Sequence, residues 1–158
     1  MVKRLDFQVD IPTVEQLTDA LESAHVNLMP DWGRMSATEM LHHVADFGDL
    51  YFGEIKVNLF TRFAAGLLGL FFLRTLITKS PLGGTPRNLR TIPEIKASKC
   101  EARDWELGLK RVGSMFNRLE AMNTKIQNHP LYGRMYTSDF KALVLHHTAH
   151  HFHQFALI

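Results

Sequence analysis

Apolar residues recur at helical spacing in several stretches of the chain, with polar residues on the opposite side of each predicted helix. One start is marked clearly, because Ser36 and Glu39 have the spacing of a capping box. No segment alternates between apolar and polar residues as a half-buried strand does. The pattern therefore predicts an all-α fold, with helices over residues 12–29, 36–55, 97–123 and 137–158.

An additional helix is expected over Leu59–Ile77, which is apolar almost all round. Its longest uncharged run, Phe63–Leu73, has 11 residues, and a membrane-spanning helix needs about 20. We therefore expect no membrane span. We expect central packing or a homodimer interface to cover this segment, in preference to a membrane-surface role. Residues 80–95 contain three prolines and two glycines, and we expect a loop there that shapes the mouth of a pocket.

Composition limits the class of protein. Hydrophobic residues make up 46% and charged residues 22% of the 158 residues, which suits one globular domain over residues 1–158. The net charge of +2 and the absence of a dense basic run argue against nucleic acid as a partner. A single cysteine, Cys100, excludes a disulfide framework, and the first residues lack the apolar stretch of a signal peptide. We expect a cytoplasmic protein.

The last predicted helix carries five of the nine histidines of the chain. On a helical wheel, His147 and His151 lie about 40° apart on the apolar side, with Gln154 beside them. The other three, which we expect to face water, form a second stripe: His146, His150 and His153. Two imidazoles one turn apart on a buried face can offer their nitrogens to one metal ion.

A third imidazole comes from the helix that begins at Ser36. His43 lies at the edge of its apolar face, whereas His42 is predicted to project to the opposite side. His43, His147 and His151 are therefore the candidate metal ligands, and three protein ligands are the number found in open catalytic sites. The alternative is a set of core histidines bonded to the backbone or to one another.

Two further residues are candidates for a role in catalysis. Glu39 lies one turn before His43, where it could orient that ligand or act as a base, although helix capping is the favoured role. Gln154 lies close to one turn after His151 and could orient this histidine or hold a water molecule.

The motif Trp-x-x-x-Ser-x-x-Glu-x-x-His-His-Val-Ala-Asp at 32–46, together with His147-x-x-x-His151-x-x-Gln154, resembles the DinB-like (YfiT-type) superfamily. The WGRM and YGRM elements and the HHFHQF ending resemble a branch of unknown function. The resemblance implies an up-and-down four-helix bundle with a long crossover, often dimeric. It also implies a three-histidine metal site, which falls on His43, His147 and His151. Relatives in that superfamily include thiol-dependent transferases or isomerases and suspected metal-dependent hydrolases.

We therefore expect a metal-dependent enzyme with Zn²⁺ or Ni²⁺ as its divalent ion. Its type would be a low-molecular-weight-thiol-dependent transferase or a hydrolase, acting on a small-molecule substrate, and we expect a homodimer. The alternative function is a non-catalytic bundle that binds small molecules or another protein, in which the histidines are structural.

Overall fold

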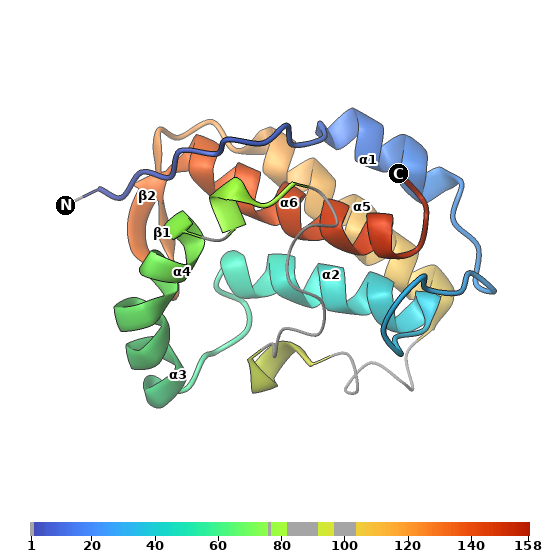
Figure 1. Ribbon diagram of the computed structural model, residues 1–158, viewed down its shortest axis with the longest axis horizontal. Helices are drawn as coiled ribbons and strands as arrows, with labels where there is room; N and C mark the ends of the chain where they lie inside the picture. The colour runs from blue at the N-terminus through green and yellow to red at the C-terminus, as the bar shows by residue number, and fades with distance from the viewer. Residues whose placement is uncertain (1, 76, 82–91, 97–103) are drawn as a thin grey trace.

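The computed structural model describes residues 2–75, 77–81, 92–96 and 104–158 of the chain. Four helices lie lengthwise beside one another (Figure 1), namely α1 (Val14–Glu22), α2 (Ala37–Tyr51), α5 (Trp105–Ala121) and α6 (Thr137–Gln154). Helix α2 packs against α5 and α6, and α1 packs against the same two helices. Helices α2 and α5 run in one direction and α1 and α6 in the other (Figure 1). Strict alternation is therefore broken between α2 and α5, where the long connection lies.

Side-chain caps fix the starts of three of these helices. Thr13 and Gln16 form a capping box at α1, and Ser36 and Glu39 form the predicted one at α2. Asp104 accepts a hydrogen bond from the backbone N–H of Leu107 and so caps α5. Helix α1 ends earlier than predicted, and α5 begins at 105; of its predicted range, residues 97–103 lie outside the described residues.

The prediction that the chain lacks strands is wrong. Strands β1 (Ile126–His129) and β2 (Gly133–Tyr136) pair antiparallel, with His129 opposite Gly133. Gly133 has a φ of 73°, which a glycine adopts without the steric cost of a Cβ atom. His129 Nδ1 accepts hydrogen bonds from the backbone N–H groups of Leu131 and Tyr132, which closes the turn. The fold is thus mostly helical with a small two-stranded sheet.

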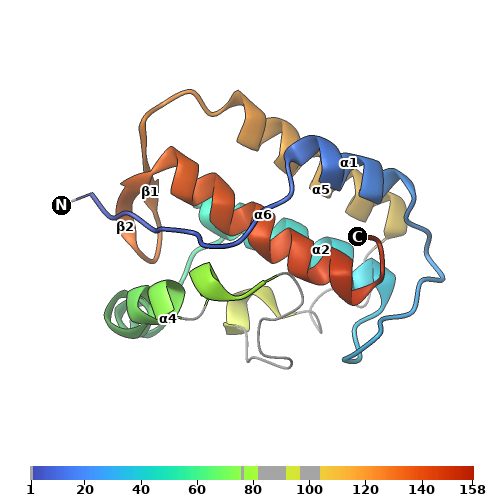
Figure 2. The same cartoon turned by 45° about the horizontal axis from the view of Figure 1, so that its top comes forward.

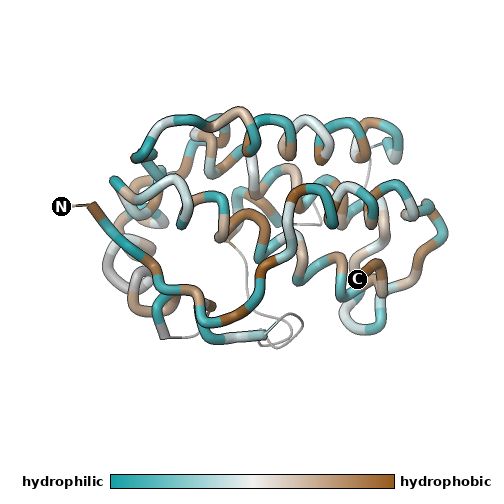
Figure 3. The backbone as a smooth tube through the Cα atoms, turned by 90° about the horizontal axis from the view of Figure 1, so that it is seen from above, coloured by the Kyte–Doolittle hydropathy of each residue, from teal (hydrophilic) through white to brown (hydrophobic). Residues whose placement is uncertain are grey.

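The core lies between the four lengthwise helices, and hydrophilic and hydrophobic residues alternate along their turns (Figure 3). Helix α2 contributes the most tightly buried face, because α5 approaches it closely. A Cβ atom on Gly48 would lie 2.4 Å from the sulfur of Met115, so any larger residue at this position would require the Met115 side chain to shift. The fully buried side chains include Leu41, Val44, Val112, Leu119, Phe140 and Phe152.

The connection between α2 and α5 begins with the predicted apolar helix, which is bent. It comprises α3 (Leu59–Ala64), a π-helical turn η1 (Ala65–Gly69) and α4 (Leu70–Thr75), followed by the 3₁₀ turns η2 (Ile77–Lys79) and η3 (Pro93–Ile95). Central packing of this segment is contradicted, because Leu59, Phe60, Phe63 and Phe71 are 71–83% exposed. Within the described part of the chain, no helix is both long and apolar enough to cross a membrane. Of the predicted loop over residues 80–95, residues 82–91 lie outside the described ranges.

Candidate metal centre

Three histidines from two helices of opposite direction converge inside the bundle. His43 projects from α2, and His147 and His151 project from consecutive turns of α6. One nitrogen of each ring lies within 4.8 Å of the other two, so these side chains could hold one metal ion. The ring centroids are 5.1 Å apart for His43 and His147, 4.8 Å for His43 and His151, and 4.7 Å for His147 and His151. The structure thus brings together the three residues that the helical wheels selected.

The orientation of His43 is fixed by the backbone of η3. Its Nδ1 lies 2.7 Å from the carbonyl oxygen of Ile95. A carbonyl oxygen can only accept, so Nδ1 carries the proton and Nε2 keeps its lone pair. Metal-binding histidines typically donate their second ring N–H to a carbonyl or a carboxylate in this way. The connection between α2 and α5 therefore supplies a group that prepares His43 as a ligand.

His151 is oriented by the amide of Gln154. Its Nδ1 donates to Gln154 Oε1 at 2.9 Å, and Gln154 Nε2 donates to the carbonyl oxygen of Trp32 at 2.6 Å. The second bond fixes which amide atom faces the imidazole, and it leaves the lone pair of His151 on Nε2. Gly33 makes this contact possible, since it has a φ of 86° and a Cβ atom there would lie 2.8 Å from Gln154 Nε2.

His147 is held by stacking. The ring of Phe47 lies parallel to the His147 ring, with 3.6 Å between the centroids and 3° between the planes. His147 Nδ1 is buried without a hydrogen-bond partner among the residues that the structure describes. A buried imidazole nitrogen without a partner is costly unless a ligand satisfies it. This orphaned atom is a second observation that fits a metal at the triad.

The electrostatics favour neutral rings. Burial lowers the pKa of His43, His147 and His151, and the neighbouring imidazoles lower the pKa of His147 and His151 further. Neutral imidazole is the form that binds a metal. In a tetrahedral zinc site with Zn–N bonds of about 2.0–2.1 Å, the ligand nitrogens would lie roughly 3.4 Å apart. In the present structure one nitrogen of each ring lies within 4.8 Å of the other two, and three neutral imidazoles are a donor set that suits a divalent ion.

The prediction that the remaining histidines face water is wrong for two of them. His42 and His146 are only 0% and 3% exposed. His146 Nε2 donates to the carbonyl oxygen of Ser80, and the Phe7 ring packs near it. His150 and His153 are half-buried and both contact the Trp32 ring. Segments distant in sequence therefore cover the outer side of α6, which a helical wheel does not show.

A polar network that was not predicted from the sequence holds α2 against α5. Arg111 Nη2 lies 2.6 Å from both Asp46 Oδ1 and Asp49 Oδ2. Arg111 Nη1 donates to His42 Nδ1 at 3.0 Å, and His42 Nε2 donates to the carbonyl oxygen of Asp104 at 2.8 Å. Burial by itself would lower the pKa of Arg111, but the hydrogen bonds and charges of Asp46 and Asp49 outweigh it and raise the pKa, so Arg111 stays charged. The local signal was present, because His42, Asp46 and Asp49 share one side of α2.

The candidate catalytic residue Glu39 faces the start of its helix. Its Oε2 accepts a hydrogen bond from the backbone N–H of Ser36 at 2.6 Å. Capping therefore engages this carboxylate, whereas Gln154 contacts the triad directly through His151.

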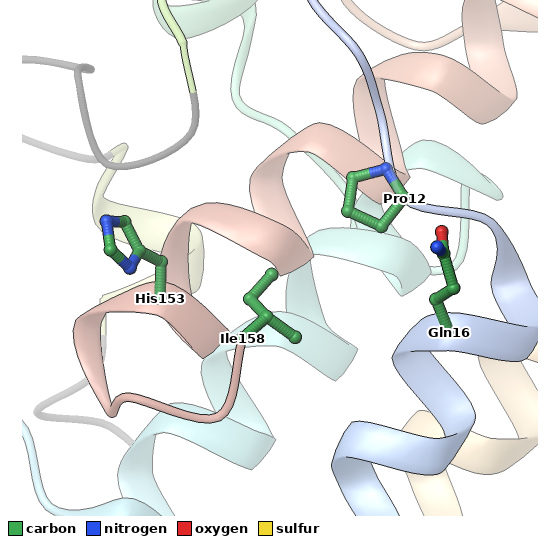
Figure 4. A pocket seen from close by; sticks show the side chains of 4 residues that line it. All are labelled: Pro12, Gln16, His153 and Ile158. Carbon is green, nitrogen blue, oxygen red and sulfur yellow. The ribbon is translucent and has the colours of Figure 1, made fainter.

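Two cavities lie outside the triad. A cavity of about 270 Å³ is lined by Pro12, Gln16, His153 and Ile158, where the start of α1 lies near the C-terminal residues that follow α6 (Figure 4). A cavity of about 590 Å³ is lined by residues in the segments 26–30 and 33–37. None of the three ligand candidates lines either one.

The family of the chain follows from its sequence as a whole. The model of a family of proteins of unknown function, DUF1569, matches residues 3–157. The chain belongs to this family. No curated protein and no solved structure matches the chain. Membership of DUF1569 leaves the chemistry to be argued from the site itself.

Proposed function

We propose that this DUF1569 protein is a metal-dependent enzyme of the DinB-like four-helix-bundle type, with His43, His147 and His151 as the ligands of one Zn²⁺ or Ni²⁺ ion. The proposal rests on the hydrogen bonds that fix the orientation and the proton position of two of the ligand rings. Ile95 and Gln154 hold the Nδ1 protons of these two rings, which leaves each Nε2 lone pair free for a metal. Both ions accept imidazole ligands.

A divalent ion held by three imidazoles has an open coordination position, and it lowers the pKa of a water or thiol bound there, which supplies a nucleophile at neutral pH. The residues of the chain orient this site. Gln154 and the Ile95 carbonyl fix the rings of two ligands, and Phe47 covers one face of the third. The groups that contact the triad directly include the Phe47 ring, the Gln154 amide and the Ile95 carbonyl, none of which is a nucleophile. We therefore assign the nucleophile to water or to a low-molecular-weight thiol, as in a hydrolase or a thiol-dependent transferase.

The second candidate function is a non-catalytic bundle that binds a small molecule. It is favoured by one observation, namely that both cavities are lined by residues other than the triad. In this case the ion would stabilise the bundle and the ligand would bind elsewhere. The homodimer, the cytoplasmic location and the role of Glu39 as a base stay predictions from the sequence.

Elemental analysis of protein purified without a histidine tag and without a metal column tests the first part of the proposal. We expect close to one Zn or Ni per chain, and a higher midpoint of thermal unfolding when metal-free protein is titrated with either ion. Metal-free protein that gains no stability from either ion would contradict the metal site. Calorimetry with glutathione on loaded and metal-free protein then tests the thiol-dependent transferase, because binding that requires the metal is expected only where the thiol reaches the ion.

A further inference from the structure

The bent helix formed by α3, η1 and α4, hereafter the α3–α4 arm, exposes large apolar side chains. Leu59 is 83% exposed, Phe60 82%, Phe63 71% and Phe71 72%. The arm lies at one end of the four lengthwise helices, beside them and not between them (Figures 1 and 2). The main contacts of α3 are with its own continuation η1. Single exposed apolar residues are ordinary, but a cluster of this size marks an interaction surface.

The arm itself carries charged residues of one sign. Residues 56–79 contain four basic residues and no Asp or Glu, and all four basic side chains are exposed: Lys56, Arg62, Arg74 and Lys79. The nearest acidic group of η3, Glu94, accepts hydrogen bonds from the backbone and side-chain N–H groups of Asn58, at the start of α3. The arm therefore combines exposed aromatic rings with a positive surround.

Exposed aromatic rings surrounded by basic residues favour some binding partners of the arm over others. A second copy of the chain, docked arm to arm, would bring together two surfaces that each carry four cations and no acidic residue between 56 and 79, which is unfavourable. A membrane-spanning role is not supported, because no helix among the described residues is long and apolar enough to cross a membrane. An anionic lipid surface would interact favourably with both groups of side chains. The boundary between headgroups and acyl chains accepts the aromatic rings, and the negative headgroups attract the basic residues.

We propose that the α3–α4 arm docks on an anionic bilayer surface, with Phe60, Phe63 and Phe71 at the boundary between headgroups and acyl chains. Segments of this kind lie in the plane of the interface and bury their apolar side about 5–10 Å deep. The four lengthwise helices and the triad stay outside the bilayer. The proposal does not depend on the metal site, and its test does not require an activity.

Flotation with vesicles measures the interaction. The full-length protein is mixed with vesicles of phosphatidylcholine alone and with vesicles that also contain phosphatidylglycerol. We expect binding to the anionic vesicles that weakens as salt is raised, since salt screens the attraction. The double variant Phe60→Ser, Phe63→Ser should bind at least about tenfold more weakly, because two rings no longer leave water. Arg62→Glu should lose about fivefold for each unit of charge.

Two matched substitutions elsewhere serve as controls. Met29→Ser removes a side chain that is 80% exposed, and Lys110→Glu reverses an exposed charge on α5; both should bind vesicles as the natural protein does. Circular dichroism identifies any variant that fails to fold, and Arg62→Glu then tests the surface without removing an apolar group. No binding of the natural protein to anionic vesicles would overturn the proposal. A dimer in light scattering that the double phenylalanine variant dissociates, with vesicle binding unchanged, would overturn it in favour of a second copy.

Discussion

Two adjacent histidines of α2 have similar burial and different partners. His42 and His43 are 0% and 4% exposed, and each donates one ring N–H to a backbone carbonyl, that of Asp104 for His42 and that of Ile95 for His43. They differ in what faces the other nitrogen. For His42 it is the guanidinium of Arg111 at 3.0 Å, whereas for His43 it is the pair of imidazoles of α6.

The difference gives a criterion for separating a structural histidine from a candidate metal ligand. A guanidinium can only donate, so the lone pair of His42 is already used and both of its nitrogens serve the contact between α2 and α5. The Nε2 lone pair of His43 faces two other neutral imidazoles. Neither of them has to donate a proton to it, so the three rings can bind one cation together. Burial alone would not distinguish the two residues; the partner of the second nitrogen does.

The largest expected effect is on metal binding by the triad. His43→Ala, His147→Ala and His151→Ala should each abolish near-stoichiometric binding, because two imidazoles are too few protein donors for a tight site. Elemental analysis and calorimetric titration measure this. His25→Ala, which removes an exposed histidine of the same chain, is the control and should keep full metal content. Partial loss in all four variants would indicate loose binding by many histidines instead of one site.

The other side of α2 should affect stability and leave metal binding intact. Arg111→Met keeps the alkyl stem and removes the cation that faces Asp46, Asp49 and His42. We expect a loss of about 3 kcal/mol in the free energy of unfolding, typical of breaking one partner of a largely buried pair. Arg118→Met is the matched control, because the Arg118 side chain is 40% exposed, and it should cost less than about 1 kcal/mol. Urea unfolding compares them, and equal losses would contradict the contrast.

An intermediate effect is expected at Gln154. Gln154→Leu keeps the approximate size of the side chain and removes the acceptor of the His151 Nδ1 proton. Loss of such an orienting partner typically weakens metal affinity by about 10–100-fold. Calorimetry should show this fall, while Gln127→Leu, on the hairpin, should keep the affinity of the natural protein. An unchanged affinity in Gln154→Leu would show that His151 does not need this hydrogen bond.

The last prediction concerns a third kind of buried histidine, whose effect at neutral pH is the smallest. His129 Nδ1 accepts two backbone N–H bonds, and burial lowers the pKa of His129 to about 3. In the unfolded chain its pKa returns to about 6.5. The unfolded state therefore binds the proton first, so the stability is complete above about pH 6.5 and is lost as the pH falls from there toward 3.

His129→Asn tests this dependence, because the Asn oxygen can accept the turn hydrogen bonds and does not titrate in this range. We expect a lower stability at neutral pH and a shallower loss on acidification than in the natural protein. Urea unfolding of metal-free protein between about pH 7 and about pH 4 gives both slopes. Identical slopes would show that His129 is not protonated on unfolding. The other buried histidines should leave some slope in the variant, since burial lowers their pKa as well.

Features that depend on the spacing of residues close together along the chain could be predicted from the sequence alone. The capping box of Ser36 and Glu39 formed as predicted, because its partners are three residues apart. The 3.6-residue period of α6 put His147 and His151 on one side, and the period of α2 turned His43 toward the interior. The position of Gln154 close to one turn after His151 similarly anticipated their hydrogen bond. The resemblance and the wheels agreed on the same three residues.

Which side of each helix is buried depends on segments that meet only in the folded protein. His42 is buried by Arg111, 69 residues away, and His146 is capped by Ser80, 66 residues away, so no local pattern could report their burial. The β1–β2 hairpin was not predicted, because strands of four residues are too short to show a periodic pattern, although Pro130 and Gly133 mark a turn. The apolar segment that the sequence placed under cover is exposed at Phe60 and Phe63. Hydrophobic pattern predicts which side chains favour burial, but only the packing of distant segments determines which of them are buried.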